Sequence, residues 1–147
     1  RGAFVTRMSQ KDIAEACFAR YLLESSFVED KTIKVSNELI SEFEKIIKQM
    51  VKAAKDQDLS TLVYLDTEFH TLIVNLSGRD RIRQLWHTLD GQMGSLMRSS
   101  LDSQKIDLKE VVVRHQELLD CIKKKDFKLM KKALADHYIT DEKEIPS

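Results

Sequence analysis

Glycine and proline are scarce in this chain of 147 residues, which has four glycines and a single proline. An all-β fold needs many tight turns, and turns are rich in these two residues. The scarcity therefore argues for long helices joined by short loops. The sequence also lacks any apolar run near the roughly 20 residues that a membrane-spanning helix requires. We expect neither a membrane anchor nor a secretory signal, and we expect a cytoplasmic location.

Excess charge of either sign is missing as well. Lysine and arginine together number 24, as do aspartate and glutamate, so the formal net charge at pH 7 is zero. Without a positive excess there is no electrostatic argument that this domain itself binds nucleic acid or an anionic membrane.

The chain has only two cysteines, Cys17 and Cys121. Both fall on apolar helical faces, which favours buried thiols in a reducing compartment over a disulfide.

What the sequence does have is apolar residues at helical spacing along most of its length. In the stretch 58–78 these residues are Leu62, Leu65, Phe69, Leu72, Ile73 and Leu76. Asp58 or Ser60 can cap the start of that helix, and Gly78 fits just past its end. Similar spacing predicts five more helices, at 9–25, 36–56, 80–99, 107–124 and 126–139. We therefore predict an all-α fold, an antiparallel bundle of about six helices.

One carboxylate lies at the edge of the apolar face of the 58–78 helix. Asp66 falls beside Phe69 and Ile73, and His70 follows it by four residues, which stacks the two side chains one turn apart. A carboxylate that faces a core raises the free energy of the folded state unless something pairs with it. The rest of the chain must supply that partner.

Three of the four histidines fall on inward helical faces. These are His70, His115 and His137, whereas His87 lies off its apolar stripe and is expected to be exposed. Together with Asp66 they would converge in the bundle core, where helical bundles build metal sites. The donor set suits Zn²⁺, Ni²⁺, Mn²⁺ or Fe²⁺. A single inward histidine is more often a hydrogen-bonded core residue than a metal ligand, so the metal interpretation depends on the four residues occurring together.

Five short stretches also match a known family in order and spacing, over nearly the whole chain. They are Arg1-Gly2-Ala3-Phe4-Val5, Arg20-x-x-x-Glu24, Asp66-x-x-Phe69-His70, Arg114-His115-Gln116-Glu117-Leu118-Leu119 and Asp136-His137. On these residues the chain resembles the C-terminal ligand-binding domain, the FCD domain, of FadR-type GntR transcription regulators. The first stretch is similar to the close of a winged-helix DNA-binding domain. The resemblance thus implies that 1–8 are the end of that missing domain and its linker, and that 9–147 form the effector-binding domain.

The resemblance also implies a site. In metal-binding members of this family, a divalent cation is held at the positions of Asp66, His70, His115 and His137, and a small carboxylate effector binds beside it. The arginine that helps hold the effector corresponds to Arg20. All four metal positions are present here, unlike in the branch that binds acyl-CoA. The expected function is an effector-sensing, non-enzymatic domain of a bacterial regulator that forms a homodimer and reaches operator DNA through its N-terminal domain.

Several alternatives stay open at this point. Arg20 and Glu24 are spaced for a surface salt bridge, and Arg98, a second candidate for effector binding, is equally a solvated residue at a helix end. The same Asp/His₃ site would also serve a helical metalloenzyme, a hydrolase or transferase. Such an enzyme needs a general acid or base, and Glu117, the obvious spare carboxylate, points away from His115 on its helix. Finally, two family positions differ, since Arg79 replaces an asparagine and Lys125 replaces a glycine.

Overall fold

The computed structural model of the chain describes residues 9–89, 91 and 107–139. Within these residues there are only helices and no strands. Five helices have defined bounds: α1 (Gln10–Glu24), α2 (Asn37–Lys55), α3 (Leu59–Asn75), α5 (Leu108–Lys124) and α6 (Phe127–Tyr138). Residues 80–89 are also helical. The predicted all-α bundle of about six helices is therefore confirmed, and no helix in the described ranges is long and apolar enough to cross a membrane.

Short polar side chains begin the helices where the sequence predicted them. Ser9 and Asp12 form a reciprocal capping box at the start of α1. Asp58, rather than Ser60, caps α3 by accepting from the backbone N–H of Thr61. These local hydrogen bonds fix where each helix starts. They therefore fix which side chains each helix turns toward the core.

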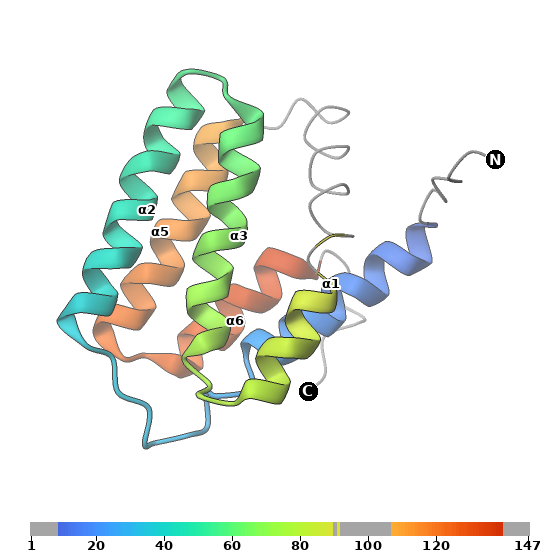
Figure 1. Cartoon of the computed structure of the whole chain (residues 1–147), viewed down its shortest axis with the longest axis vertical. Helices are drawn as coiled ribbons and strands as arrows, with labels where there is room; N and C mark the ends of the chain where they lie inside the picture. The colour runs from blue at the N-terminus through green and yellow to red at the C-terminus, as the bar shows by residue number, and fades with distance from the viewer. Residues whose placement is uncertain (1–8, 90, 92–106, 140–147) are drawn as a thin grey trace.

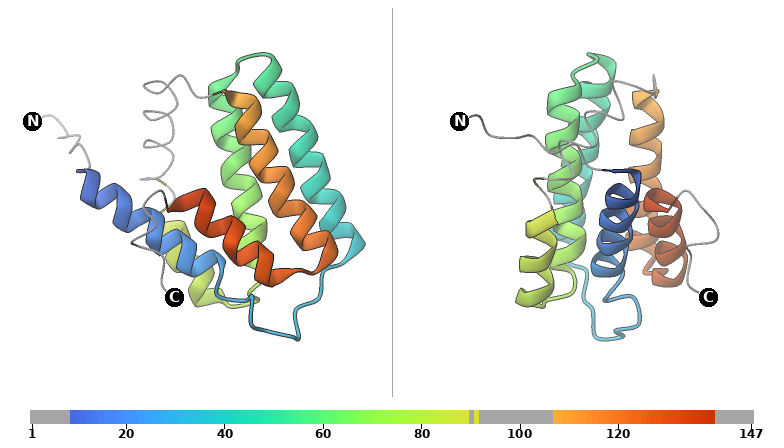
Figure 2. Two further views of the ribbon diagram at one scale, coloured as in Figure 1. Left: turned by 180° about the vertical axis from the view of Figure 1, so that it is seen from behind. Right: turned by 90° about the vertical axis from the view of Figure 1, so that its right-hand side faces the viewer.

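Helices α2, α3 and α5 lie side by side, and α2 runs opposite to both α3 and α5 (Figure 1). Helices α1 and α6 pack against each other and cross the end of this layer at which α3 and α5 finish (Figure 2). The helical residues 80–89 lie next to α1 at the same end (Figure 1). The middle of α3 carries Asp66 and His70, and side chains from α1, α5 and α6 meet these two residues there.

Phe69 of α3 and Phe43 of α2 meet edge to face in the core, with ring centroids 4.9 Å apart. Two apolar residues that continue the helical spacing of their segments are nevertheless exposed: Val51 of α2 is 52% and Leu85 of the 80–89 helix is 56% exposed. Val51 lies at the edge of the α2 stripe. The 80–89 helix buries only the face that carries Trp86. Gly94 and most of the predicted 80–99 helix beyond residue 89 lie outside the described residues.

Lys125 ends α5 in the left-handed region, with φ 54° and ψ 30°. Its N–H bonds to the carbonyl of Ile122, and the N–H of Asp126 bonds to that of Cys121, so the turn is a regular helix stop. A side chain at such a position costs about 1–2 kcal/mol, which glycine avoids. Lys125 stands at the position where the FCD family, which this chain resembles, has glycine.

We expect Lys125→Gly to raise the free energy of unfolding by about 1 kcal/mol, because it removes the strain of the left-handed conformation. Urea denaturation of the two proteins measures the difference. The matched control is Lys124→Gly, one residue earlier and inside α5, which should lower the free energy of unfolding by roughly 0.5–1 kcal/mol. Equal destabilisation by both glycines would show that the turn at Lys125 is unstrained.

Candidate metal centre

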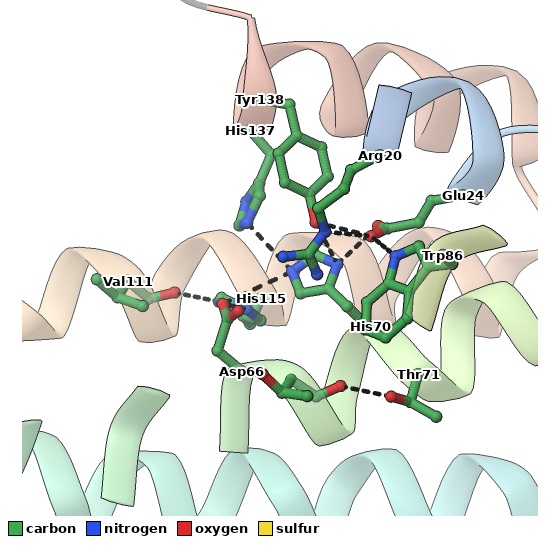
Figure 3. Close-up of polar contacts among 11 residues, drawn as sticks. Arg20, Glu24, Asp66, His70, Thr71, Trp86, Val111, His115, His137 and Tyr138 are labelled. Carbon is green, nitrogen blue, oxygen red and sulfur yellow. Dashed lines mark hydrogen bonds and ion pairs between the residues drawn. The ribbon is translucent and has the colours of Figure 1, made fainter. Parts of the chain in front are cut away.

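The four predicted metal ligands converge in the bundle. Asp66 and His70 come from α3, His115 from α5 and His137 from α6 (Figure 3). Each offers one ligand atom, and the four atoms all lie within 4.8 Å of one another. The three imidazole rings form a nearly equilateral triangle, with centroid separations of 5.2, 4.9 and 5.0 Å. Asp66, His70 and His115 are buried, and His137 is partly buried.

Neighbouring side chains position this cluster. Phe69 packs edge to face against His115, with ring centroids 4.9 Å apart. It also lies 5.8 Å from the ring of His70, the next residue along α3. Phe69 fills the apolar side of both rings, while Nε2 of each ring faces Asp66 at the polar centre of the cluster. His87 is exposed, as the sequence predicted.

His115 presents a lone pair to the cluster. Its Nδ1 lies 2.7 Å from the carbonyl oxygen of Val111, and a carbonyl only accepts, so Nδ1 carries a proton. Its Nε2 lies 2.9 Å from Oδ1 of Asp66. In the neutral ring both of these atoms are acceptors, and neither has a hydrogen-bond partner among the described residues. Two buried acceptors this close need a cation, either a proton or a metal ion.

His70 is oriented in the same way by a different group. Its Nδ1 lies 2.7 Å from Oε2 of Glu24. Its Nε2 faces inward, 3.2 Å from Nε2 of His137 and 3.7 Å from Oδ1 of Asp66. Metal-binding histidines are usually held like this, with the outer nitrogen donating to a carbonyl or carboxylate and the inner one free for the ion.

Sequence reasoning missed the importance of Glu24. Its side chain is fully buried, and its Oε1 accepts from Nε1 of Trp86 and from the hydroxyl of Tyr138, both at 2.7 Å. Arg20 lies beside it, with Nε 3.4 Å from the same oxygen. The predicted pairing of Arg20 with Glu24 is therefore present, but as a buried contact rather than a surface salt bridge. The only local signal was two charged residues on the inward face of α1.

Arg20 reaches from α1 toward the same buried region as the four ligands (Figure 3). Its guanidinium carbon lies 4.6 Å from the ring centroid of Trp86 and 5.2 Å from that of Tyr138, both within the range of cation–π attraction. Arg98, the second predicted effector residue, lies outside the described residues. The structure thus brings one of the two candidate effector residues to the cluster.

The charges in the cluster stabilise one another. Burial raises the pKa of Asp66, but the rings of His70 and His115 and the charge of Arg20 outweigh burial and hold that pKa well below its usual range. Burial also opposes ionisation of Glu24, yet His70, Arg20 and Trp86 lower its pKa. Burial and the neighbouring His70 and His115 keep the pKa of His137 well below 6.5. The cluster therefore contains one carboxylate, Asp66, and a neutral His137, with the carboxylate of Glu24 beside it; a carboxylate and neutral imidazoles are donors suited to a divalent cation.

An open groove with a cavity volume of about 430 Å³ runs between α5 and α6 and is lined in part by His137. Its other lining residues include Cys121, Arg114 and Glu117, and Glu117 is exposed to solvent as expected. Cys121 and Cys17 are both free thiols. The groove therefore lies against one edge of the cluster, at His137.

Residues 13–140 match the family model of the FCD domain. The chain is 30% identical over 142 residues to the gluconate operon transcriptional repressor of Bacillus subtilis, and 28% identical over 141 residues to that of Bacillus licheniformis. Each alignment covers 93% of this chain and 58% of the relative, so the chain spans little more than half the length of these curated relatives.

Among solved structures, E. coli McbR/YncC has a similar fold, with a TM-score of 0.79 and 19% sequence identity. The similarity covers 90% of this chain and 66% of that one. The family resemblance inferred from the five short stretches is confirmed. The chain belongs to the FCD domain family, the ligand-binding domain of FadR-type GntR transcription regulators.

Proposed function

We propose that this chain is the effector-sensing, metal-binding domain of a bacterial transcription regulator. One observation carries the metal-binding part: Asp66, His70, His115 and His137 turn their ligand atoms toward one buried point. Family membership supports the regulatory part, since two relatives of this chain are repressors of an operon.

The residues fit a divalent cation. Oδ1 of Asp66 and Nε2 of His115 are buried without a hydrogen-bond partner in the described part of the chain, and a cation between them would satisfy both. Ligands about 2.1 Å from one metal ion lie roughly 3–4 Å from each other, so the present separations need only a small adjustment. Three imidazoles and one carboxylate suit Zn²⁺, Ni²⁺, Mn²⁺ or Fe²⁺.

The proposed effector is a small organic acid. A bound cation would supply positive charge for a carboxylate, and Arg20 adds a guanidinium, whose planar fork matches a carboxylate. Arg20 is buried beside Glu24, so its charge is little weakened by solvent. With a divalent cation bound beside Arg20, this part of the core would have an excess of positive charge, which a neutral ligand would not offset, so sugars are disfavoured and mono- or dicarboxylates favoured.

The full-length protein would join this sensor to DNA. We place the end of a winged-helix DNA-binding domain and a linker at residues 1–8, with the sensor at 9–147, in a cytoplasmic protein that contacts its operator through the winged helix. Effector binding would then modulate DNA binding. The net charge of zero fits this division of labour, because the sensor itself has no basic excess for nucleic acid.

We infer a regulator rather than a metalloenzyme. A hydrolase or transferase needs a proton-transferring group beside the metal. Glu117 is exposed. Glu24, the buried carboxylate outside the proposed ligand set, already accepts from Trp86, Tyr138 and His70, and so is poorly placed to take a proton from a substrate.

We expect the purified protein to bind about one divalent metal ion per chain and His115→Ala to lose it, because the variant removes a buried ligand. His87→Ala, which changes an exposed histidine, should leave the metal content unchanged. Elemental analysis after reconstitution measures the ratio. Since ligand imidazoles must be neutral, affinity should weaken about tenfold or more as the pH falls from 7.5 to 5.5. A protein that takes up no metal at pH 7.5 would contradict the proposal.

The effector prediction compares how organic acids change the melting temperature of three proteins: metal-loaded, metal-free and Arg20→Ala. Small mono- and dicarboxylates should raise the melting temperature of the metal-loaded protein by several degrees, because they bind only the folded state. Metal-free protein and Arg20→Ala should each lose most of this response, since each lacks one of the two positive groups. Thermal-shift assays with a panel of acids, and with neutral sugars as controls, measure it. An identical response from all three proteins would mean that the acids bind elsewhere.

We also expect a homodimer, because symmetric dimers are the commonest oligomers and match operators that have two half-sites. Sedimentation velocity at micromolar concentration measures the mass in solution. A monomer in the full-length protein would count against this expectation. Using the full-length protein matters, because the DNA-binding domain could contribute to the interface.

A further inference from the structure

We propose that Glu24 is a positioning residue for the metal centre. Through its contact with Nδ1, Glu24 holds His70 in the tautomer that leaves Nε2 unprotonated and directed at the ion. This inference rests on the proposed metal binding, but it concerns a residue outside the ligand set. Glu24 lies on α1, which contributes no ligand to the cluster.

The donors around Glu24 define how its two oxygens are used. Oε1 lies 2.7 Å from Nε1 of Trp86 and 2.7 Å from the hydroxyl of Tyr138. An indole N–H can only donate, so Oε1 is an acceptor. Arg20 adds a third donor, with Nε at 3.4 Å from the same oxygen. Three donors on one oxygen favour a carboxylate over a neutral carboxyl group at this buried position.

The other oxygen of Glu24 then decides where the proton of His70 lies. Oε2 is 2.7 Å from Nδ1 of His70, and a carboxylate has no proton to give. The hydroxyl oxygen of Tyr138 is 3.0 Å from the same Nδ1, and its own proton points at Glu24. Two acceptors thus face Nδ1, which must be the protonated nitrogen. The lone pair on Nε2 is left to face Asp66 and His137.

The same hydrogen bonds connect the metal centre to the rest of this end of the bundle. Trp86 comes from the helical residues 80–89 and Tyr138 from α6, and both meet Glu24 from α1 (Figure 3). His70 is therefore oriented by groups from three different segments. In addition, Glu24 contacts both a ligand, His70, and the proposed effector residue, Arg20.

Glu24→Gln tests the proposal with almost no change in shape. The amide has one acceptor and one donor end. Its oxygen is needed by the three donors of Trp86, Tyr138 and Arg20, so its NH₂ must face Nδ1 of His70. An NH₂ group donates to Nδ1 and so moves the ring proton to Nε2, where it blocks the lone pair. The matched control is Glu68→Gln, the same change at an exposed position of α3.

Two measurements decide the matter. Two-bond ¹H–¹⁵N correlations of the imidazole rings in the metal-free protein, assigned with His70→Ala, report which nitrogen of His70 is protonated. Competition titration with Zn²⁺ reports affinity. We expect a proton on Nδ1 in the wild type and on Nε2 in Glu24→Gln, with Zn²⁺ affinity about 10–100-fold weaker in that variant. Glu68→Gln should match the wild type in both.

A wild-type His70 protonated on Nε2 would overturn the proposal, and this reading needs no variant to fold. Wild-type Zn²⁺ affinity in Glu24→Gln would also overturn it. If the wild type binds no metal ion, the proposed function fails, and the tautomer measurement alone still decides whether Glu24 positions His70.

Discussion

The structure depends on a negative charge placed where an apolar side chain would normally be. Asp66 is buried on α3 beside Phe69, and an isolated carboxylate in such a place would cost several kcal/mol. Its neighbours lower that cost, because rings from three helices turn nitrogen atoms toward it. The crossing of α1 and α6 over the end of α3 is consistent with this demand (Figure 2), since these two helices bring Arg20 and His137 to the carboxylate.

A second layer of hydrogen-bonding groups surrounds Asp66 and the three histidines. Val111 and Glu24 each accept from the outer nitrogen of a histidine, one through a backbone carbonyl and one through a carboxylate. The carbonyl comes from the preceding turn of α5 and follows automatically from helix formation. The carboxylate comes from a different helix and must be positioned by tertiary packing. Accordingly, the orientation of His115 is a local property of α5, whereas that of His70 depends on the whole end of the bundle.

This difference explains how much the sequence could predict. The helices, the caps and the inward placement of Asp66, His70, His115 and His137 follow from spacing within single helices, and the structure has them where they were predicted. Glu24 was read only as a partner for Arg20, because its other partners lie 46, 62 and 114 residues away along the chain. Periodicity also overestimated burial at the edges of helices. It cannot show how wide a face the neighbouring helices cover.

The buried charges also bear on which ligand would suit this core. Asp66 and Glu24 contribute two negative charges and Arg20 one positive charge, so with neutral imidazoles the ligand-free cluster has a formal charge of minus one. A divalent cation would reverse this to plus one. A single carboxylate would then bring the cluster to neutrality, the state that a low-dielectric interior tolerates best. Glu24 would therefore affect the charge that a bound ligand should have: without this carboxylate, two negative charges rather than one would be needed for neutrality.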